Sequence, residues 1–224
     1  MSPIARRILL LLLWSNTAAR SQTFEGNQVT VAHTVSSWSR FAVLISSQQM
    51  PISLMTDAQL RIGQQQVSQG RVHLNYHLSP QTSFSIGGIA FTRQGSTTTT
   101  IALAQVLHAF AEQGIVPAVR LRFDYRWQTH HELPELSRQN WRLRLQPAIS
   151  APITPRLKFI LNTELFFEYS TPLLIDENRL QVGVQWQAFD TATLLTAYQN
   201  RAFFGRTMKF EHSLFIVLLV RLQV

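Results

Sequence analysis

The feature that most constrains the fold is a two-residue alternation of apolar and polar side chains along most of the chain. It is clearest at 118–127, where Val119, Leu121, Phe123, Tyr125 and Trp127 alternate with Ala118, Arg120, Arg122, Asp124 and Arg126. Successive side chains of a strand point to opposite faces, so a period of two indicates strands with different surroundings on each face. The alternation recurs at 52–62, 71–78, 140–149, 157–168 and 179–187. The sequence therefore predicts an all-β protein.

Strand length and connections distinguish among all-β folds. The alternating segments run for about 10 to 14 residues, whereas strands of soluble proteins centre near 5–6 and tilted membrane strands need about 9–11. Short connections are predicted at 48–51, 79–81, 111–114, 151–154 and 189–190, and looser ones at 64–70, 93–96, 129–137, 170–177 and 201–209. Alternating tight turns and longer loops are typical of outer-membrane barrels. We therefore expect a closed antiparallel transmembrane β-barrel.

The composition agrees with a barrel in a membrane. Charged residues make up 14% of the chain, whereas soluble domains carry about 25%. No run reaches the roughly 18 apolar residues that a membrane helix needs. Cysteine is absent, which excludes disulfides, thiolate metal sites, cysteine nucleophiles and an acylated N-terminal cysteine.

The number of strands depends on the first alternating segment. Eleven strands can be identified between 38–46 and 211–224, and the first and last would then run in the same direction. A closed antiparallel barrel takes an even number of strands. Residues 28–35 alternate too and can supply a twelfth strand, although Ser36-Ser37 would make a very tight connection. We expect twelve strands with both ends of the chain in the periplasm, and ten strands is the alternative.

An export signal is expected at the N-terminus. Arg6 and Arg7 precede an apolar core at 8–14, and Ala19-Arg20-Ser21 suits a signal peptidase, with a second possible site at 17–19. We expect a signal peptide at 1–21 and the barrel at 22–224, with a retained N-terminal anchor as the alternative. Loss of three leader arginines lowers the formal charge from +8 to +5. The other arginines are spread along strands, which argues against nucleic acid as a partner.

The final strand and the aromatic residues indicate an outer-membrane location. One face of 214–224 is apolar up to the last residue, formed by Leu214, Ile216, Leu218, Val220, Leu222 and Val224. Tyr125, Trp127 and Trp141 lie beside the predicted loop at 129–137, and Trp186 lies near the opposite rim, as in the aromatic girdles of membrane barrels. The expected partners are outer-membrane lipid and the machinery that assembles barrels.

Several segments carry a family resemblance. They are "VRLRFDYRWQ", "WRLRLQPAISAPI", "LKFILNTELFFEY", "ENRLQVGVQW" and "HSLFIVLLVRLQV". On these segments the chain resembles an uncharacterised family of bacterial outer-membrane barrels with a domain of unknown function. That resemblance implies the fold and the location, but no substrate. A weaker similarity, to small monomeric porins for acidic oligosaccharides, implies an arginine-lined lumen that passes such solutes.

The candidate site is a set of charged residues on the predicted inner face. It comprises Arg120, Arg122, Arg126, Arg142 and Arg144 with Asp124, Glu164 and Glu168. Arginine pairs bidentately with carboxylates and phosphates. One interpretation is a positive wall that faces a small anionic solute in a passive channel. The other is an internal ion-pair network in a filled barrel with a structural or interaction role, because narrow barrels fill their interior with side chains.

No cofactor, metal or catalytic residue is expected. His73 and His77 would lie about 13 Å apart along a strand, and His130 and His131 near Glu132 and Glu135 show no spacing of a dedicated metal site. A lipid-modifying enzyme would need a serine beside a histidine on the outer face. The available residues, Ser137 or Ser213 with His130 or His212, show no recognisable arrangement. We therefore expect a protein that is not an enzyme.

Overall fold

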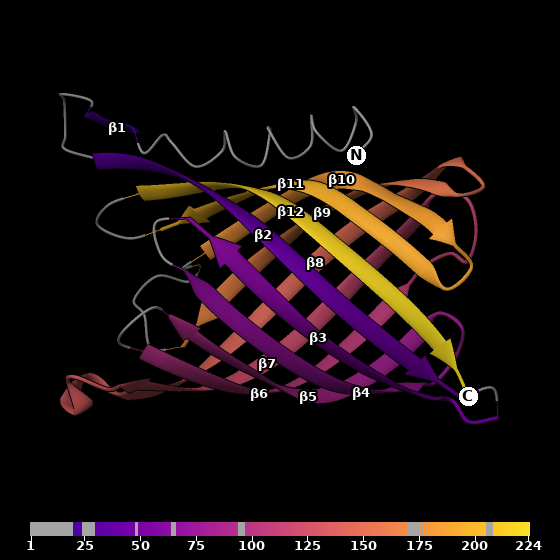
Figure 1. Cartoon of the computed structure of the whole chain (residues 1–224), viewed down its shortest axis with the longest axis horizontal. Helices are drawn as coiled ribbons and strands as arrows, with labels where there is room; N and C mark the ends of the chain where they lie inside the picture. The colour runs from indigo at the N-terminus through magenta and orange to yellow at the C-terminus, as the bar shows by residue number, and fades with distance from the viewer. Residues whose placement is uncertain are drawn as a thin grey trace, which may run out of the picture.

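The structure is a computed structural model that describes residues 20–23, 30–47, 49–63, 66–93, 97–169, 175, 177–204 and 208–224. The strands are β1 (Arg20–Thr23), β2 (Thr30–Ser46), β3 (Ile52–Ile62), β4 (Val67–His77), β5 (Thr82–Arg93), β6 (Thr97–Ala109), β7 (Val116–His130), β8 (Arg138–Thr154), β9 (Leu157–Glu168), β10 (Glu177–Phe189), β11 (Ala192–Phe203) and β12 (Met208–Gln223). A short 3-10 helix, η1 (Pro134–Leu136), lies between β7 and β8 (Figure 1). The predicted all-β class is confirmed.

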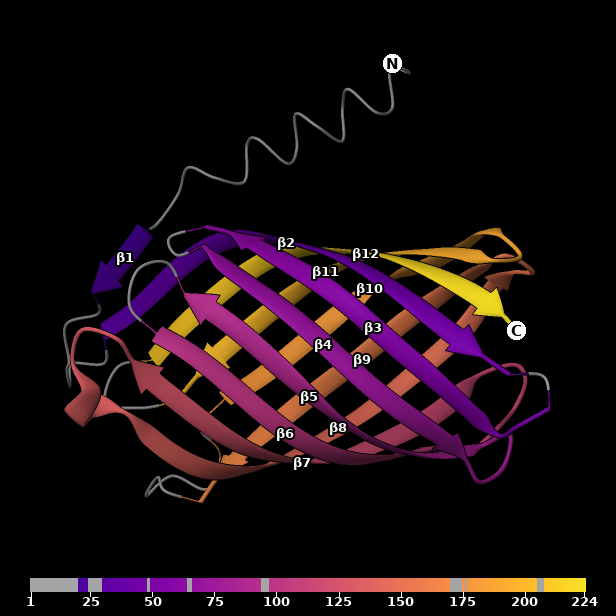
Figure 2. The ribbon, with the colours of Figure 1, turned by 60° about the horizontal axis from the view of Figure 1, so that its bottom comes forward.

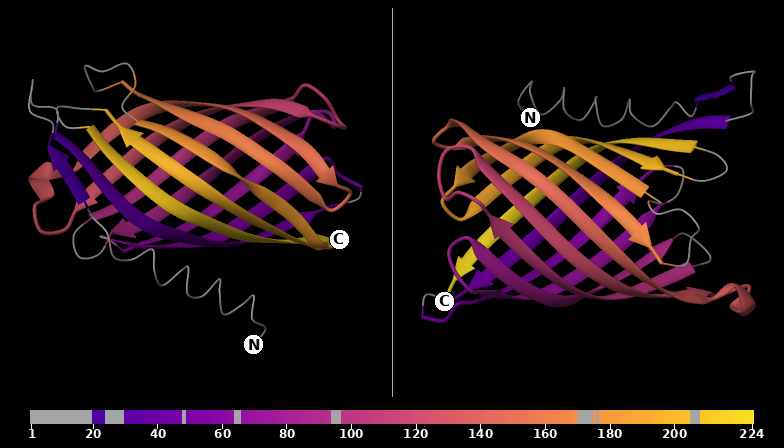
Figure 3. Two further views of the ribbon diagram at one scale, coloured as in Figure 1. Left: turned by 90° about the horizontal axis from the view of Figure 1, so that it is seen from above. Right: turned by 180° about the vertical axis from the view of Figure 1, so that it is seen from behind.

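The strands close into a single barrel. Consecutive strands from β2 to β12 pair antiparallel, and β2 and β12 pair in parallel along their lengths, from Val31 with Met208 to Ser46 with Gln223. Among the described residues, eleven strands form this ring (Figures 2 and 3). The short β1 pairs antiparallel with Thr30–His33, before β2 meets β3, and so lies outside the ring.

The predicted twelve strands, and the alternative of ten, are therefore wrong. Residues 30–35 do not form a strand of their own, because β2 continues through Ser36 and Ser37 without a turn; residues 28 and 29 lie outside the described residues. Ser36 pairs with Ser213 of β12, and its Oγ donates to Glu211 Oε1 at 2.6 Å and accepts from Trp38 Nε1 at 3.2 Å. The parallel pairing of the first and last strands removes the need for an even number.

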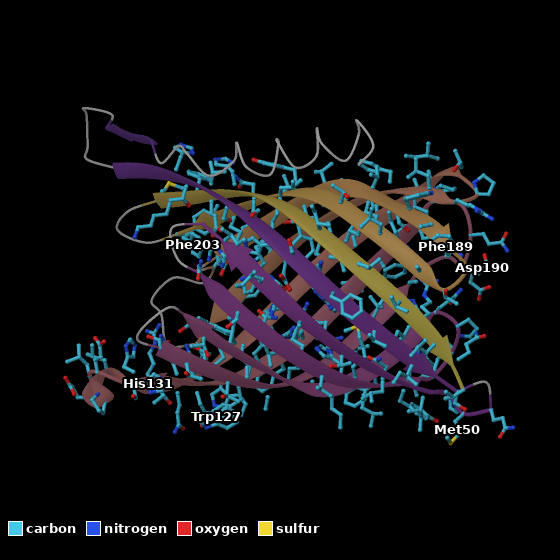
Figure 4. All side chains as sticks on the ribbon, viewed as in Figure 1. Met50, Trp127, His131, Phe189, Asp190 and Phe203 are labelled. Atoms are coloured by element: carbon cyan, nitrogen blue, oxygen red, sulfur yellow. The ribbon has the colours of Figure 1, made fainter. Side chains whose placement is uncertain are left out.

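The start of β2 and the end of β12 lie at opposite ends of the barrel. We call the end with the connections at 47–51, 78–81, 110–115, 155–156 and 190–191 the turn rim, and the other end the loop rim. Met50, Phe189 and Asp190 mark the turn rim, and Trp127, His131 and Phe203 lie toward the loop rim (Figure 4). Because β2 begins at the loop rim while β12 ends at the turn rim, the prediction that both ends share one rim is wrong.

The predicted division into inner and outer faces is confirmed. Outward apolar side chains remain accessible, and polar side chains are buried inside the ring. On β7 and β8 the contrast is clear, because Arg122 is 2% exposed and Trp141 is 47% exposed. An apolar exterior around a charged interior is the reverse of a soluble fold. Among the described residues, no helix is long and apolar enough to cross a bilayer.

The connections differ in length less than predicted. The expected loop at 64–70 is largely strand, since β4 begins at Val67, and β5 and β6 are joined by 94–96. Residues 68–70 are polar or small, yet they pair with Ala58–Leu60. Backbone hydrogen bonds suffice for such pairing, so the side-chain pattern did not reveal it. At the turn rim, Gly114 adopts φ +69°, a left-handed conformation that favours glycine.

Candidate functional site

The inner wall surrounds a cavity of about 460 Å³ between the two rims. Its charged lining is dominated by arginine, and the carboxylates at its surface are Glu164, Glu168 and Glu177. The arginines are Arg40, Arg61, Arg71, Arg120, Arg122, Arg126, Arg138, Arg142, Arg144, Arg179 and Arg201. Every one has the strand parity that points inward, so the alternation of the sequence brings them to one space.

Asp124 on β7 is the centre of the most buried group. The register places Asp124 opposite Arg142 and Arg122 opposite Arg144, all on the inner face. Arg122 Nε donates to Asp124 Oδ1 at 2.5 Å, and Oδ2 accepts from Arg142 Nη2 at 3.1 Å and from Arg144 Nη1 at 3.3 Å. The Asp124 side chain is fully buried. One carboxylate thus holds three guanidinium groups together.

A chain of ion pairs continues from this group around the wall. Arg144 donates through Nη2 to Glu164 at 2.5 Å. Glu164 also lies 3.5 Å from Arg120 and 3.8 Å from Arg179. Beyond Arg179 the chain runs across β10, β11 and β12 to β3, with N–O distances of 2.6 to 2.9 Å; its members are Glu177, Arg201, Glu211 and Arg61.

Two further groups complete the charged lining. On β2–β4, Asp57 accepts from Arg40 and from Arg71, each at 2.8 Å. Near the loop rim, Glu168 pairs with Arg126 at 3.4 Å and accepts from Asn140. Ion pairs therefore tie the barrel together across strands that are distant in sequence.

Aromatic side chains inside the barrel, among them Phe166 and Trp38, support the guanidinium groups. Phe166 is fully buried, and the guanidinium carbons of Arg142, Arg144 and Arg179 lie 4.7, 4.6 and 4.3 Å from its ring centre. Trp38 lies 5.4 Å from Arg61 in the same manner. A cation above an aromatic face is attracted by the ring quadrupole. The rings therefore help to hold several like charges close together.

The ion-paired lining carries an excess of positive charge. Among the described residues, ten arginines share six carboxylates in these pairs, which leaves a surplus of four positive charges. Several buried donors also have no hydrogen-bond partner in the described part of the chain, among them Arg122 Nη2, Arg120 Nε and Arg142 Nε. Excess positive charge and unpaired donors together favour an anionic ligand.

The structure brings all eight predicted site residues together on β7, β8 and β9. The sequence interpretation missed the part of the network on the other strands, formed by Arg40, Asp57, Arg61, Arg71, Glu177, Arg179, Arg201 and Glu211. It also missed Phe166. The alternation carried the signal, because 164, 166 and 168 share one parity, but a phenylalanine is normally assigned to the lipid side of a barrel.

The remaining chemical candidates are dispersed. His73 is buried, whereas the His77 ring bonds Ser53 Oγ at 3.1 Å. The described residues contain no group of three or more metal-ligating side chains. Ser213 is buried and its Oγ donates to a backbone carbonyl, while His212 bonds Tyr198 Oη at 2.6 Å on the outer face. Ser213 and His212 therefore do not form a hydrolase pair.

The chain belongs to the family described as "Protein of unknown function (DUF2490)", whose profile matches residues 35–211. Among curated proteins, no sequence matches the chain significantly. The predicted membership of an uncharacterised barrel family is thus confirmed.

The chain is similar in structure to solved porins. The structure titled "NanC porin structure in rhombohedral crystal form" is similar with a TM-score of 0.52 and 12% identity, covering 79% of this chain and 90% of that one. A second, "KdgM porin in complex with disordered oligogalacturonate", has a TM-score of 0.48 and 9% identity over 74% of this chain and 91% of that one. The first likeness shows a porin-like β-barrel fold.

Proposed function

We propose that this member of the DUF2490 family is an outer-membrane barrel that gives small acidic solutes passive and anion-selective passage. The observation that carries the proposal is the surplus of four positive charges on the ion-paired lining of the lumen. A low-dielectric wall lined by charge of one sign raises the local concentration of counter-ions. An anion therefore enters this lumen more readily than a cation.

The exterior supports an outer-membrane location. Phe123, Tyr125, Trp127 and Trp141 form an outward cluster toward the loop rim, with ring centres 4.0 to 4.9 Å apart between neighbours. Trp186 is also exposed and lies close to the turn rim. Aromatic rings near both ends of an apolar exterior suit the two interfaces of a bilayer. On this proposal residues 1–21 are removed during export, and the apolar final strand β12 is recognised by the assembly machinery.

A second candidate function is a filled barrel with a structural or interaction role. It is favoured by a specific observation: each of the ten ion-paired arginines has a carboxylate oxygen within 4 Å. Phe166 and Asp124 are completely buried beneath these arginines. Such a wall could strengthen the barrel without conducting.

Conductance in planar bilayers separates the two functions. In a KCl gradient the reversal potential should show preference for chloride over potassium. Arg120→Gln should weaken that preference, because this side chain is 30% exposed and its 3.5 Å pair with Glu164 is long. A unit charge acts on an ion 4 Å away by about 1 kcal/mol in water, so the permeability ratio should fall by up to about fivefold.

A matched control is Arg156→Gln, which removes an exposed arginine from the turn between β8 and β9. This variant should leave the permeability ratio of chloride to potassium unchanged. Folded protein that shows no openings would reject the porin function and favour the filled barrel.

A further inference from the structure

One part of the inner wall is apolar, against the alternation that governs the rest of the barrel. Ile89 on β5 and Ile101 and Leu103 on β6 are buried and pack with Phe91. Ile89, Phe91 and Ile101 line the same cavity as the arginines. These inward side chains present no hydrogen-bonding group to a solute.

A second apolar part lines the cavity from other strands. Leu195 on β11 and Phe215 and Val217 on β12 also line it. Around the ring, β6 and β12 are separated by five strands in one direction and four in the other, so they are on opposite sides. The two apolar parts therefore lie on opposite sides of the ring and line the same cavity.

The arginines occupy the other two sides. β8, which carries Arg142 and Arg144, is separated from β3 by five strands one way and four the other. β3 carries Arg61, and its neighbours β2 and β4 carry Arg40 and Arg71. The lining is thus basic, apolar, basic and apolar in turn around the cavity.

We infer that the cavity selects carboxylates with an apolar body, such as alicyclic or aromatic acids, over sugar acids of equal charge. The inference rests on the proposed anion-selective function and names its substrate class. A ring that lies against Ile101 and its neighbours Ile89 and Phe91 removes apolar surface from water. Its carboxylate reaches a guanidinium group on either basic side. A ring hydroxyl in the same position meets carbon and loses its hydrogen bonds to water.

The size of the cavity agrees with this class. About 460 Å³ lies in the range of pockets that hold single small molecules. The paired sides act together, because the apolar sides select the body of the solute and the basic sides select its charge.

The test compares two anions that differ only in ring hydroxyls. Cyclohexanecarboxylate and quinate share one ring and one carboxylate, and quinate adds hydroxyl groups. Reversal potentials in planar bilayers, with one potassium salt on each side, give the permeability ratio of the two anions. The wild-type barrel should prefer cyclohexanecarboxylate. The double variant Ile89→Thr, Ile101→Thr keeps β-branched side chains and should lower the ratio at least about threefold.

Two further variants make the result decisive. Ile86→Thr on the outer face of β5 is the matched control and should leave the ratio unchanged. Val217→Thr is nearly isosteric, tests the opposite apolar side, and replaces the double variant if that one does not fold.

The failure of this inference differs from that of the proposed function. Absence of anion preference in KCl would reject anion-selective passage itself. Two results would overturn the inference while the anion-selective porin stands, both with anion preference in KCl. In the first, the permeability ratio of cyclohexanecarboxylate to quinate is near unity. In the second, neither inner-face variant changes that ratio. A preference for cyclohexanecarboxylate that falls in the inner-face variants alone supports it.

Discussion

Asp124→Asn tests whether the internal network stabilises the barrel. The substitution keeps the shape of the side chain but removes the charge that three guanidinium groups share. In the described part of the chain, Arg122 and Arg142 have Asp124 as their single carboxylate partner, whereas Arg144 also pairs with Glu164. Two buried cations therefore lose their counter-charge.

The expected cost follows from burial. Asp124 is fully buried and Arg122 is 2% exposed, so water cannot replace the lost partner. Removal of one member of a buried ion pair costs about 3–5 kcal/mol. We expect Asp124→Asn to lower the free energy of unfolding by that amount. It should also raise the surplus of positive charge from four to five, so anion preference should not fall. Stability and selectivity should therefore not decline together.

Urea unfolding of protein refolded in lipid vesicles, followed by tryptophan fluorescence, measures the change. The control Asp190→Asn removes an exposed carboxylate from the turn rim and should change stability by less than about 0.5 kcal/mol. Adding Arg122→Gln to Asp124→Asn removes one orphaned charge and should restore part of the loss. The reasoning is refuted if Asp124→Asn lies within about 1 kcal/mol of wild type or if the second substitution makes the protein less stable.

Four further predictions concern packing and closure. Gly87→Ala should destabilise the barrel by about 1–3 kcal/mol, because a Cβ there would lie 2.2 Å from a carbonyl oxygen of β4, as urea unfolding would show. Gly70→Ala, where the Cβ meets nothing within 4 Å, should instead stabilise by about 0.5–1 kcal/mol in the same assay. Phe166→Leu should cost about 1–2 kcal/mol in unfolding free energy, since it removes the ring below three guanidinium groups. Ser39→Cys with Ile216→Cys should form a disulfide on oxidation, visible by gel mobility, because these residues are partners across the parallel pairing.

Each of these has its own contradicting result. Equal stability of the two alanine variants would show that the close approach at Gly87 is not tight. A leucine at 166 that leaves stability unchanged would remove the case for cation–π support. The chain has no native cysteine, so Ser39→Cys with Val220→Cys, four residues out of register, is a clean control that should stay unlinked.

Much of the candidate site could be predicted because strand parity is a local property. Arg120, Arg122 and Asp124 alternate with Leu121 and Phe123 in the printed sequence, and this alone assigns the first three to the interior. Phe166 shows where the rule misleads. Its parity is inward, but its type suggests lipid, and the reason it lies inside is the three arginines that surround it from other strands.

The apolar sides of the cavity could not be predicted in this way. Ile89 and Ile101 are inward apolar residues among outward apolar neighbours, so a pattern of apolar and polar residues cannot tell their faces apart. Their position opposite Val217 depends on which strands face one another, and thus on how many strands close the ring.

The sequence by itself determined the barrel class, the inward and outward faces of most strands and the charged character of the interior, because a period of two is written residue by residue. Only the tertiary structure decided the closure: a parallel pairing of β2 with β12, eleven strands in the described ring, and ion pairs such as Arg61 with Glu211. The reason is physical. Closure depends on backbone hydrogen bonds between the two ends of the chain, and those bonds are nearly blind to side-chain identity.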